Sequence, residues 1–368
     1  MRIVFRTDAS LEIGSGHMMR CLTIAEALRV RGEECYFICR EHPGHLIERI
    51  ERSGFPVHVL AMEDGFPDPA GSAPAHAAWL GASAAADADH TRLAFQGMQV
   101  HWLVVDHYAL DASWERALRS SCERIMVIDD LADRAHDCDL LLDQNLGRSQ
   151  ADYEGLVPPG CITLTGPHYA LLASQFSATR AMSLKGRAER GCHKVMISLG
   201  GVDQHDVTSW VLEALRNCTL PEDLSFTVVM GRTAPWTERV KAVAASMPWP
   251  TEVRVDVRDM ATLMAASDLA IGAAGSTSWE RCCLGLPGIL MVLAENQRGI
   301  ANALEAAGAV AVVDHATAGA QVTFARTFER LATDPAARAH MSAAAAQVTD
   351  GHGAGRVAAR MLEGGVRP

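Results

Sequence analysis

A histidine flanked by glycines lies in the segment from Asp8 to Cys21, a setting that suits chemistry on phosphorylated ligands. Gly14 and Gly16 allow the backbone to turn sharply and to approach a ligand closely. His17 follows them at the expected start of a helix, where free N–H groups favour a bound phosphate. The positive end of that helix disfavours an imidazolium, so we expect a neutral His17 that can serve as a general base.

Polar residues also follow two apolar runs that are typical of buried strands. The first run ends in Asp106, His107 and Tyr108, and the second ends in Asp129 and Asp130. The carboxyl ends of strands face the ligand in open α/β sheets, so the first three residues are candidates for substrate contact, with simple capping as the alternative. For the aspartate pair, helix capping is the more typical role.

The second half of the chain repeats the pattern of a strand, a glycine-rich loop and a helix. Gly200 and Gly201 follow the apolar segment 194–199 and precede a helical pattern. A Gly-Gly turn alone is weak evidence for ligand binding. Because it repeats the arrangement of the first half, we interpret it as a second phosphate-binding loop.

A further loop of small residues, which includes Gly275, follows the apolar segment 269–272. Its backbone N–H groups and the hydroxyl groups of Ser276 and Thr277 could bind a diphosphate. Glu280, in the first turn of the following helix, could accept both hydroxyl groups of a ribose. The alternative role for Glu280 is to complement the helix dipole with a negative charge.

Short apolar runs alternate with helical patterns along the chain, which indicates parallel sheets covered by helices. The strands predicted in the first half are 2–7, 35–39, 56–60, 101–106, 124–128, 139–142 and 161–164. Those predicted in the second half are 194–199, 225–230, 252–255, 269–272, 288–292 and 309–313. We therefore predict an α/β fold of two Rossmann-like domains that face a cleft, with the cleft at the carboxyl ends of the strands.

A basic segment with interspersed Gly and Ala marks the expected junction between the domains. We place the N-terminal domain, which carries the histidine loop, at 1–176, a linker at 177–193 and the second Rossmann-like domain at 194–350. Residues 351–368 are expected to form a C-terminal helix and tail. The connection 61–95, rich in Ala, Gly, Pro and Asp, has little pattern, and no function is read from it.

The composition argues against several classes of partner. A formal net charge of −11 over 368 residues and a pI near 5.7 disfavour nucleic acid and anionic membranes, since both need a basic face. The 10 cysteines are scattered without a Cys-x-x-Cys pair, which predicts reduced thiols and no metal site. The chain has no signal-peptide pattern and no apolar run of bilayer length, so we expect a cytoplasmic protein.

The motifs described so far occur in a fixed order with several others. Together they occupy 6–10, 13–17, 20–21, 106–108, 143–145, 152–158, 169–172, 198–201, 275–280, 285–287 and 295–297. This ordered set resembles the UDP-sugar hydrolase family of pseudaminic acid biosynthesis, over nearly the whole chain. That family is similar in fold to the two-domain glycosyltransferases, so the resemblance implies a glycosyltransferase-B-like architecture.

The resemblance also implies roles for individual residues. His17 is the implied general base, Tyr108 a substrate-site residue, and the second domain the site of UDP. The other implied substrate-binding positions are Asp8, Gly14, Gly16, Arg20, Asp106, Asn145, Gly200, Gly201, Gly275, Ser276, Thr277, Glu280, Asn296 and Gln297. No cofactor or metal ion is expected, because N–H groups and helix ends can stabilise the departing UDP.

The expected reaction is hydrolysis of the anomeric C–O bond of UDP-2,4-diacetamido-2,4,6-trideoxy-β-L-altropyranose, with inversion, by a water that His17 activates. The free sugar would serve pseudaminic acid synthesis, for example for flagellin glycosylation, and we expect a monomer or a weak dimer. Two alternatives stay open: a glycosyltransferase that uses the same UDP site, and a nucleotide-sugar binding protein without turnover. The intact loop 14–17 argues against the second alternative.

Overall fold

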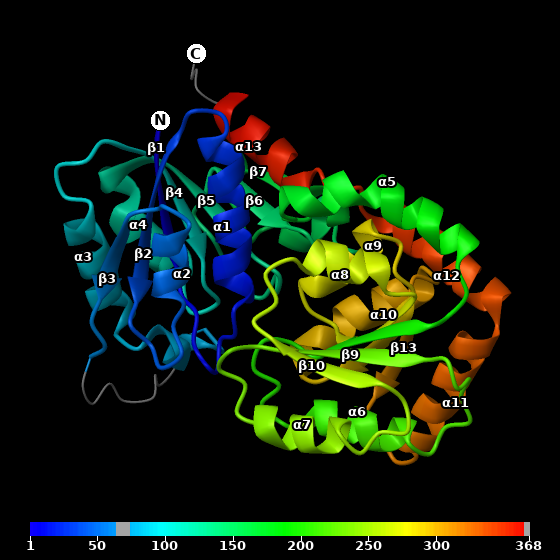
Figure 1. The fold of residues 1–368 in the computed structure, drawn as a ribbon. Coiled ribbons are helices and arrows are strands. Elements are labelled where there is room, and N and C mark those ends of the chain that lie inside the picture. Colours follow the sequence, from blue (N-terminus) through cyan, green and yellow to red (C-terminus); the bar gives the residue numbers. More distant parts are fainter. Residues whose placement is uncertain (64–73, 364–368) are drawn as a thin grey trace. The chain divides into compact units, whose positions relative to one another are not determined.

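The computed structural model describes residues 1–63 and 74–363 (Figure 1). The chain forms two compact units, and each is described by itself. The first unit comprises Met1–Leu171 together with Ala354–Pro368, and the second comprises Leu172–Gly353. The predicted tail beyond residue 363 lies outside the described residues. None of the described helices is long and apolar enough to cross a membrane.

A parallel sheet of seven strands forms the centre of the first unit, in the order β3-β2-β1-β4-β5-β6-β7. Its strands are β1 (Arg2–Thr7), β2 (Glu34–Arg40), β3 (Val57–Leu60), β4 (Val100–Asp106), β5 (Cys122–Ile128), β6 (Leu140–Asp143) and β7 (Ile162–Thr165). The prediction of a parallel sheet from these apolar runs is therefore confirmed.

Helices cover both faces of this sheet. They are α1 (Gly16–Arg29), α2 (Ile47–Arg52), α3 (Ala84–Ala94), α4 (Ala112–Leu118) and α13 (Gly353–Glu363), with short 3-10 turns η1 (Ala77–Leu80), η2 (Arg119–Ser121), η3 (Gln150–Tyr153) and η4 (Pro167–Tyr169).

Alternate residues of each strand point to opposite faces and so enter different cores. Ile3 and Phe5 pack in one cluster with α1 and with Val357 of α13, whereas Val4 packs in the other with Trp114 of α4. Helix α13, red in Figure 1, therefore completes the core of the first unit although it is the last of the described helices.

The second unit is built around a parallel sheet of six strands in the order β10-β9-β8-β11-β12-β13. The strands are β8 (Lys194–Ser198), β9 (Ser225–Met230), β10 (Thr251–Val255), β11 (Leu269–Ala273), β12 (Gly288–Val292) and β13 (Ala311–Asp314). The helices are α5 (Ser174–Glu189), α6 (Val207–Leu215), α7 (Thr237–Ala244), α8 (Met260–Ala266), α9 (Thr277–Cys283), α10 (Arg298–Ala306), α11 (Ala320–Thr333) and α12 (Pro335–Val348), with the 3-10 turn η5 (Glu295–Gln297).

The segment 177–193, predicted as a linker, differs from that expectation because most of it is helix α5 of the second unit. Its arginines bond to backbone carbonyl groups rather than to solvent. Arg180 donates to the carbonyl of Ala346 at 2.6 Å and to that of Cys283. Arg187 donates to the carbonyls of Met264 and Leu284 at 2.7 and 3.0 Å. These side chains satisfy carbonyl groups at the ends of α8, α9 and α12, which explains why this helix carries several arginines.

Candidate active site

The predicted catalytic loop of the first unit lies at the point where the strand order reverses. Strands β1 and β4 are neighbours in the sheet. From β1 the strand order continues through β2 to one edge, and from β4 it continues through β5 to the other. His17 is the second residue of α1, which follows β1, and Asp106 is the last residue of β4. Such switch points open at the carboxyl ends of parallel strands and are the usual ligand sites of this architecture.

His17 and Asp106 form a buried hydrogen-bonded pair. The Nδ1 atom of His17 lies 2.6 Å from Oδ1 of Asp106, and the exposed fractions of the two residues are 7% and 0%. Arg20 binds the same carboxylate through Nε at 2.6 Å and Nη2 at 2.7 Å. Burial alone would raise the pKa of Asp106, but Arg20 and His17 more than offset it, so the pKa lies well below its usual value.

This arrangement fixes which nitrogen of His17 can act as a base. An ionised carboxylate accepts hydrogen bonds only, so Nδ1 of a neutral imidazole carries the proton that points at Asp106. Nε2 then keeps its lone pair, and it has no hydrogen-bond partner among residues 1–63 and 74–363. Asp106 was predicted to contact substrate, whereas the structure shows it oriented toward His17 and Arg20.

Asp130 links three of the predicted site residues. Its carboxylate accepts hydrogen bonds from Arg20 Nη1 at 2.6 Å, from the Tyr108 hydroxyl at 2.6 Å and from Asn145 Nδ2 at 3.1 Å. No helix begins after it, so the capping role that its position suggested is not what the structure shows. Tyr108 in turn meets His17 edge to face, with ring centroids 4.5 Å apart. The donor residues come from α1 and from the segments that follow β4 and β6.

Asp8, predicted to bind substrate, lies beneath this cluster rather than at its surface. It is fully buried, with Arg6 Nη1 at 2.7 Å and the backbone N–H of Arg40 at 2.7 Å. His107 and His42 approach its Oδ2 to 3.4 and 3.5 Å. Asp8 therefore ties the ends of β1, β2 and β4 together, which positions the loop that follows β1.

Gly14 and Gly16 differ in the conformations they adopt. Gly14 has a positive φ of 77° and its N–H donates to the carbonyl of Ser10, which closes the tight turn that precedes α1. Gly16 is the first residue of α1 and has an ordinary φ. Only the first of the two glycines is thus required by backbone conformation.

Asp143 supports the Asn145 loop from behind. Its Oδ1 accepts the N–H of Asn145 at 2.9 Å and its Oδ2 accepts the hydroxyl of Tyr153 at 2.8 Å. Burial, followed by the nearby charge of Asp130, raises the pKa of Asp143 to about 7. A carboxyl group behind the site thus titrates near neutral pH.

The second unit brings its two predicted loops to its own switch point. Strand β11 pairs with β8, so the loop after β8 and the loop after β11 are neighbours at one edge of the sheet. Gly200 has a φ of 99°, which glycine adopts without strain. Gly231, which follows β9, has no room for a side chain, because a Cβ there would overlap the carbonyl oxygen of Gly201.

Small residues and one carboxyl group form the other loop of this unit. A Cβ on Gly275 would meet nothing within 4 Å, and Ser276 is exposed at the start of α9 with no side-chain capping bond. The hydroxyl of Thr277 accepts a hydrogen bond from Arg281 at 3.2 Å. Glu280 Oε2 is buried and has no hydrogen-bond partner in the part of the chain that the structure describes. Burial raises the pKa of Glu280 to about 7, although the charge of Arg281 partly offsets this.

The remaining predicted positions, Asn296 and Gln297, lie in η5 after β12. The Oε1 atom of Gln297 accepts the N–H of Leu293 at 3.1 Å, so this side chain stabilises its own loop. Within 1–63 and 74–363, the structure contains no cluster of three or more His, Cys, Asp or Glu that could hold a metal ion.

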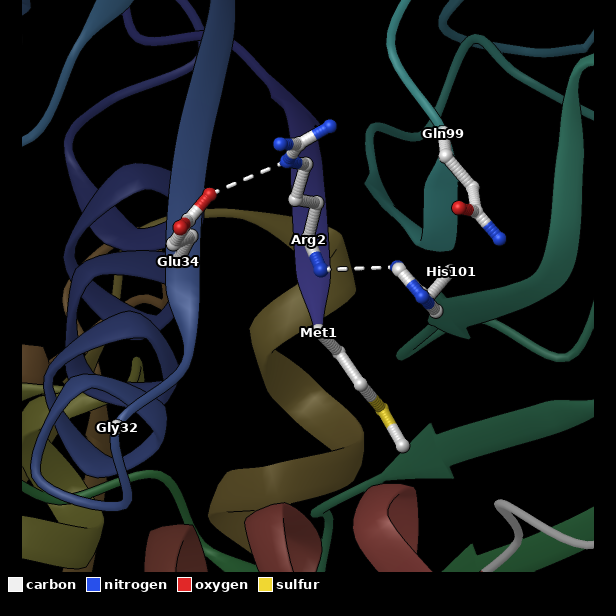
Figure 2. Close-up of a pocket in the computed structure, with 6 residues that line it drawn as sticks. All are labelled: Met1, Arg2, Gly32, Glu34, Gln99 and His101. Atoms are coloured by element: carbon white, nitrogen blue, oxygen red, sulfur yellow. Dashed lines mark hydrogen bonds and ion pairs between the residues drawn. The ribbon is translucent and has the colours of Figure 1, made fainter.

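A pocket of about 330 Å³ lies at the opposite edge of the first sheet (Figure 2). Arg2, Glu34 and His101 line it, and they come from the amino ends of β1, β2 and β4. In Figure 2 Arg2 bonds to both neighbours, with its N–H on His101 Nδ1 at 3.0 Å and its Nε on Glu34 at 3.2 Å. Ligands in this architecture bind at the carboxyl ends, so this pocket is separate from the candidate active site.

Comparison with known proteins agrees with this arrangement. Residues 195–356 match the Glycosyltransferase family 28 C-terminal domain. The crystal structure of Acinetobacter baumannii MurG superimposes with a TM-score of 0.68 at 14% sequence identity, covering 98% of this chain and 99% of that chain. The fold and its two switch-point loops thus define a protein of the glycosyltransferase-B structural class.

Two curated relatives resemble most of the chain. The UDP-2,4-diacetamido-2,4,6-trideoxy-β-L-altropyranose hydrolase of Campylobacter jejuni is 24% identical over 84% of this chain and 97% of its own length. An uncharacterized protein of Methanocaldococcus jannaschii is 21% identical over 81% of this chain, and the match spans 57% of that longer protein. The predicted resemblance to the hydrolase family of pseudaminic acid biosynthesis is therefore confirmed.

Proposed function

We propose that the protein hydrolyses the anomeric C–O bond of a UDP-linked sugar and releases UDP and the free sugar. The observation that carries this proposal is the buried pair of His17 and Asp106, which leaves Nε2 of His17 available as a base. The similarity to the Campylobacter hydrolase supports UDP-2,4-diacetamido-2,4,6-trideoxy-β-L-altropyranose as the substrate, and with it a place in pseudaminic acid biosynthesis.

The first unit supplies the base in this proposal. Nε2 of His17 takes a proton from a water molecule, whose oxygen attacks the anomeric carbon as the bond to the diphosphate oxygen breaks. The water attacks the face opposite the diphosphate and the UDP leaves with the bonding electron pair, so the configuration at the anomeric carbon inverts. Asp106 stabilises the imidazolium that forms, because its carboxylate already accepts the Nδ1–H bond.

The second unit holds the nucleotide. A Cβ on Gly200 or Gly275 would meet nothing within 4 Å, so the backbone there, and at Gly201 in the same loop as Gly200, can approach a phosphate, and exposed Ser276 adds a hydroxyl group. The unpartnered Oε2 of Glu280 is available to accept ribose hydroxyl groups. Binding a hydroxyl donor would satisfy a buried oxygen that has no partner among the residues that the structure describes.

A glycosyltransferase with the same UDP site is the second candidate. The match of residues 195–356 to the family 28 C-terminal domain favours it, since that description is of a transferase domain. The two candidates differ only in what attacks the anomeric carbon, which is water in a hydrolase and an acceptor hydroxyl group in a transferase.

Incubation with the UDP-sugar in ¹⁸O-labelled water, without an acceptor, separates these candidates. Mass spectrometry of the products should show UDP and an equal amount of free sugar that carries ¹⁸O. Tight binding of the UDP-sugar without turnover would instead favour a transferase that awaits its acceptor, a different sugar substrate or a binding protein without turnover. ¹⁸O in the UDP would mean that a P–O bond is cleaved.

His17→Asn should lower the turnover number by about 10²–10⁴-fold, the usual contribution of a positioned base. The affinity for UDP should stay within about twofold, because the nucleotide is held by the second unit. His58→Asn, at an exposed histidine of β3, is the matched control. Turnover by His17→Asn within a few-fold of the wild type would remove His17 from the base role.

A further inference from the structure

Two aromatic side chains that no motif covers lie beside Tyr108. The rings of His76 and Trp79 have centroids 4.2 Å apart, and both belong to the short segment around η1. Their centroids lie 5.5 and 6.1 Å from that of Tyr108, and the Trp79 ring is tilted by only 27° from the plane of Tyr108. All three residues are half-buried, so each keeps part of its surface open to solvent. We call these three residues the aromatic wall.

The aromatic wall lies next to the catalytic histidine. Tyr108 meets His17 at 4.5 Å between ring centroids and is fixed through its hydroxyl to Asp130. A water between Nε2 of His17 and an anomeric carbon places that carbon roughly 6 Å from the ring, about two hydrogen-bond lengths away. A sugar ring placed there would lie beside the same histidine as Tyr108, and Tyr108 in turn stacks with Trp79.

A buried ionic network holds the segment of the wall against the sheet. Asp87, in the first turn of α3, accepts Arg6 Nη2 at 2.7 Å and Arg40 Nη2 at 2.7 Å, and all three side chains are fully buried. Gly81, between η1 and α3, has a φ of 67°, and a Cβ on it would lie 2.8 Å from Met62. The segment that carries the wall is thus anchored at its C-terminal side. This reduces the conformational entropy that the segment would lose when a ligand binds.

From this placement we propose that Trp79, His76 and Tyr108 form the sugar subsite, and that the wall selects a hexose with apolar substituents, such as a 6-deoxy sugar with acetamido groups. Aromatic faces bind apolar C–H and methyl groups and offer little to a fully hydroxylated sugar. The substrate of the proposed function carries three such methyl groups, one at C6 and two on its acetamido groups. This inference rests on the proposed function for the identity of the sugar.

Binding measurements test the wall independently of catalysis. In a His17→Asn background, calorimetry gives the dissociation constants of UDP and of the UDP-sugar, and their ratio isolates what the sugar contributes. Trp79→Ala should weaken UDP-sugar binding by about 10-fold or more and leave UDP binding unchanged, since a methyl group in an apolar site accounts for about 10-fold or more. Trp79→Phe, which keeps an aromatic ring, should restore at least half of the lost binding free energy.

A second measurement distinguishes sugar recognition from a structural role. The wild type should prefer the 6-deoxy UDP-sugar to its 6-hydroxy analogue by about 10-fold in kcat/KM, and Trp79→Ala should reduce that preference to less than about threefold. Leu93→Ala, at an exposed position of α3, is the control and should leave the preference unchanged. A general loss of folding would lower both rates together and leave the preference intact.

The outcomes separate this inference from the proposed function. If the UDP-sugar loses its binding advantage in Trp79→Ala while the wild type fails to hydrolyse it, the wall stands and the proposed reaction is wrong. If the wild type hydrolyses the sugar and Trp79→Ala keeps both the advantage and the preference, the wall is not the sugar subsite. If the wild type binds the UDP-sugar no more tightly than UDP, both the sugar subsite and the proposed reaction are wrong.

Discussion

At the scale of single residues, the candidate site is organised by carboxylates with different tasks. Asp106 is held ionised by Arg20 and orients His17, whereas Glu280 has its pKa raised by burial and has no partner for Oε2 within the described chain. The first arrangement is complete without a ligand. In the second arrangement Oε2 of Glu280 is buried without a hydrogen bond, and such an oxygen costs free energy in the folded state.

Glu280→Gln tests this difference through pH. The folded-state pKa of about 7 lies above the ordinary value of 4.5, so the folded protein binds more protons than the unfolded one between these values. Glu280 should therefore lower the stability of the wild type as pH rises from about 4.5 to 7, and Glu280→Gln should lack this part of the loss, whereas the part due to Asp143 remains in both proteins. We expect the variant to be more stable by about 1–2 kcal/mol at pH 8 and indistinguishable at pH 4.5, by thermal unfolding. The value is below the full shift because Glu280 is partly open to water.

The same substitution should weaken UDP binding by about 10-fold, because an amide offers one acceptor oxygen where a carboxylate offers two. Glu222→Gln, at an exposed carboxylate between α6 and β9, serves as the control for a lost negative charge. Equal stability of Glu280→Gln and wild type at both pH values would show that Glu280 is not under strain from burial.

At the scale of elements, two glycine loops in the second unit depend on each other. The loop after β8 contacts Gly231 so closely that a methyl group there would displace the carbonyl of Gly201. We expect Gly231→Ala to weaken UDP binding by at least 10-fold and to destabilise the second unit by about 1–3 kcal/mol, the usual range for overpacking. Calorimetric titration with UDP and thermal unfolding would measure the two effects.

Gly186→Ala provides a matched control for this change. Gly186 lies inside α5, and a Cβ there would sit at an ordinary 3.5 Å from Arg190. It should leave UDP affinity unchanged and stabilise the protein slightly, because alanine is the better helix former. If both variants bind UDP like the wild type, the loop after β8 does not hold the nucleotide.

The elements that sequence could predict are those with a local signal. Apolar runs bounded by polar or glycine-rich segments located the strands, and β1, β9 and β12 have the predicted bounds. The arginines of α5 could not be interpreted in this way. Their partners are backbone carbonyl groups up to 169 residues away, which leave no residue-type pattern, so a basic helix resembled a linker.

The candidate site shows the same limit. His17 was predictable because glycines, strand and helix surround it within a few residues. The role of Asp130 was not, since its three donors are 15 to 110 residues away and belong to different elements. Trp79 lies in a segment without a periodic hydrophobic pattern. Its candidate role is visible only in the structure, where it lies beside Tyr108.

At the scale of the whole molecule, the chain enters the second unit once and then returns to the first through α13. Val357, Ala358 and Met361 have exposed fractions of 0% in the core of the first unit, and the carbonyl of Met361 accepts a hydrogen bond from Trp102 at 3.2 Å. The last helix is therefore a structural part of the unit that carries His17.

Met361→Ala and Met341→Ala form a pair that tests this assignment. Both methionines are buried, the first in the core of the first unit and the second in that of the second unit. Each substitution should cost about 2–5 kcal/mol, the usual range for a large-to-small change in a core. Hydrogen exchange followed by mass spectrometry should show faster exchange in Met1–Leu171 for Met361→Ala, and in Leu172–Gly353 for Met341→Ala. Faster exchange of the second unit in Met361→Ala would contradict the assignment of α13 to the first unit.

The return of the chain through α13 also sets an order of events on the ribosome. Translation delivers residues from the N-terminus, so all of Leu172–Gly353 emerges before the helix that the first unit still lacks. The nascent chain can thus complete its second unit while the core around β1 and α1 remains open to solvent. We expect a polypeptide truncated after Gly353 to fold in its second unit and to leave the first unit without its last helix.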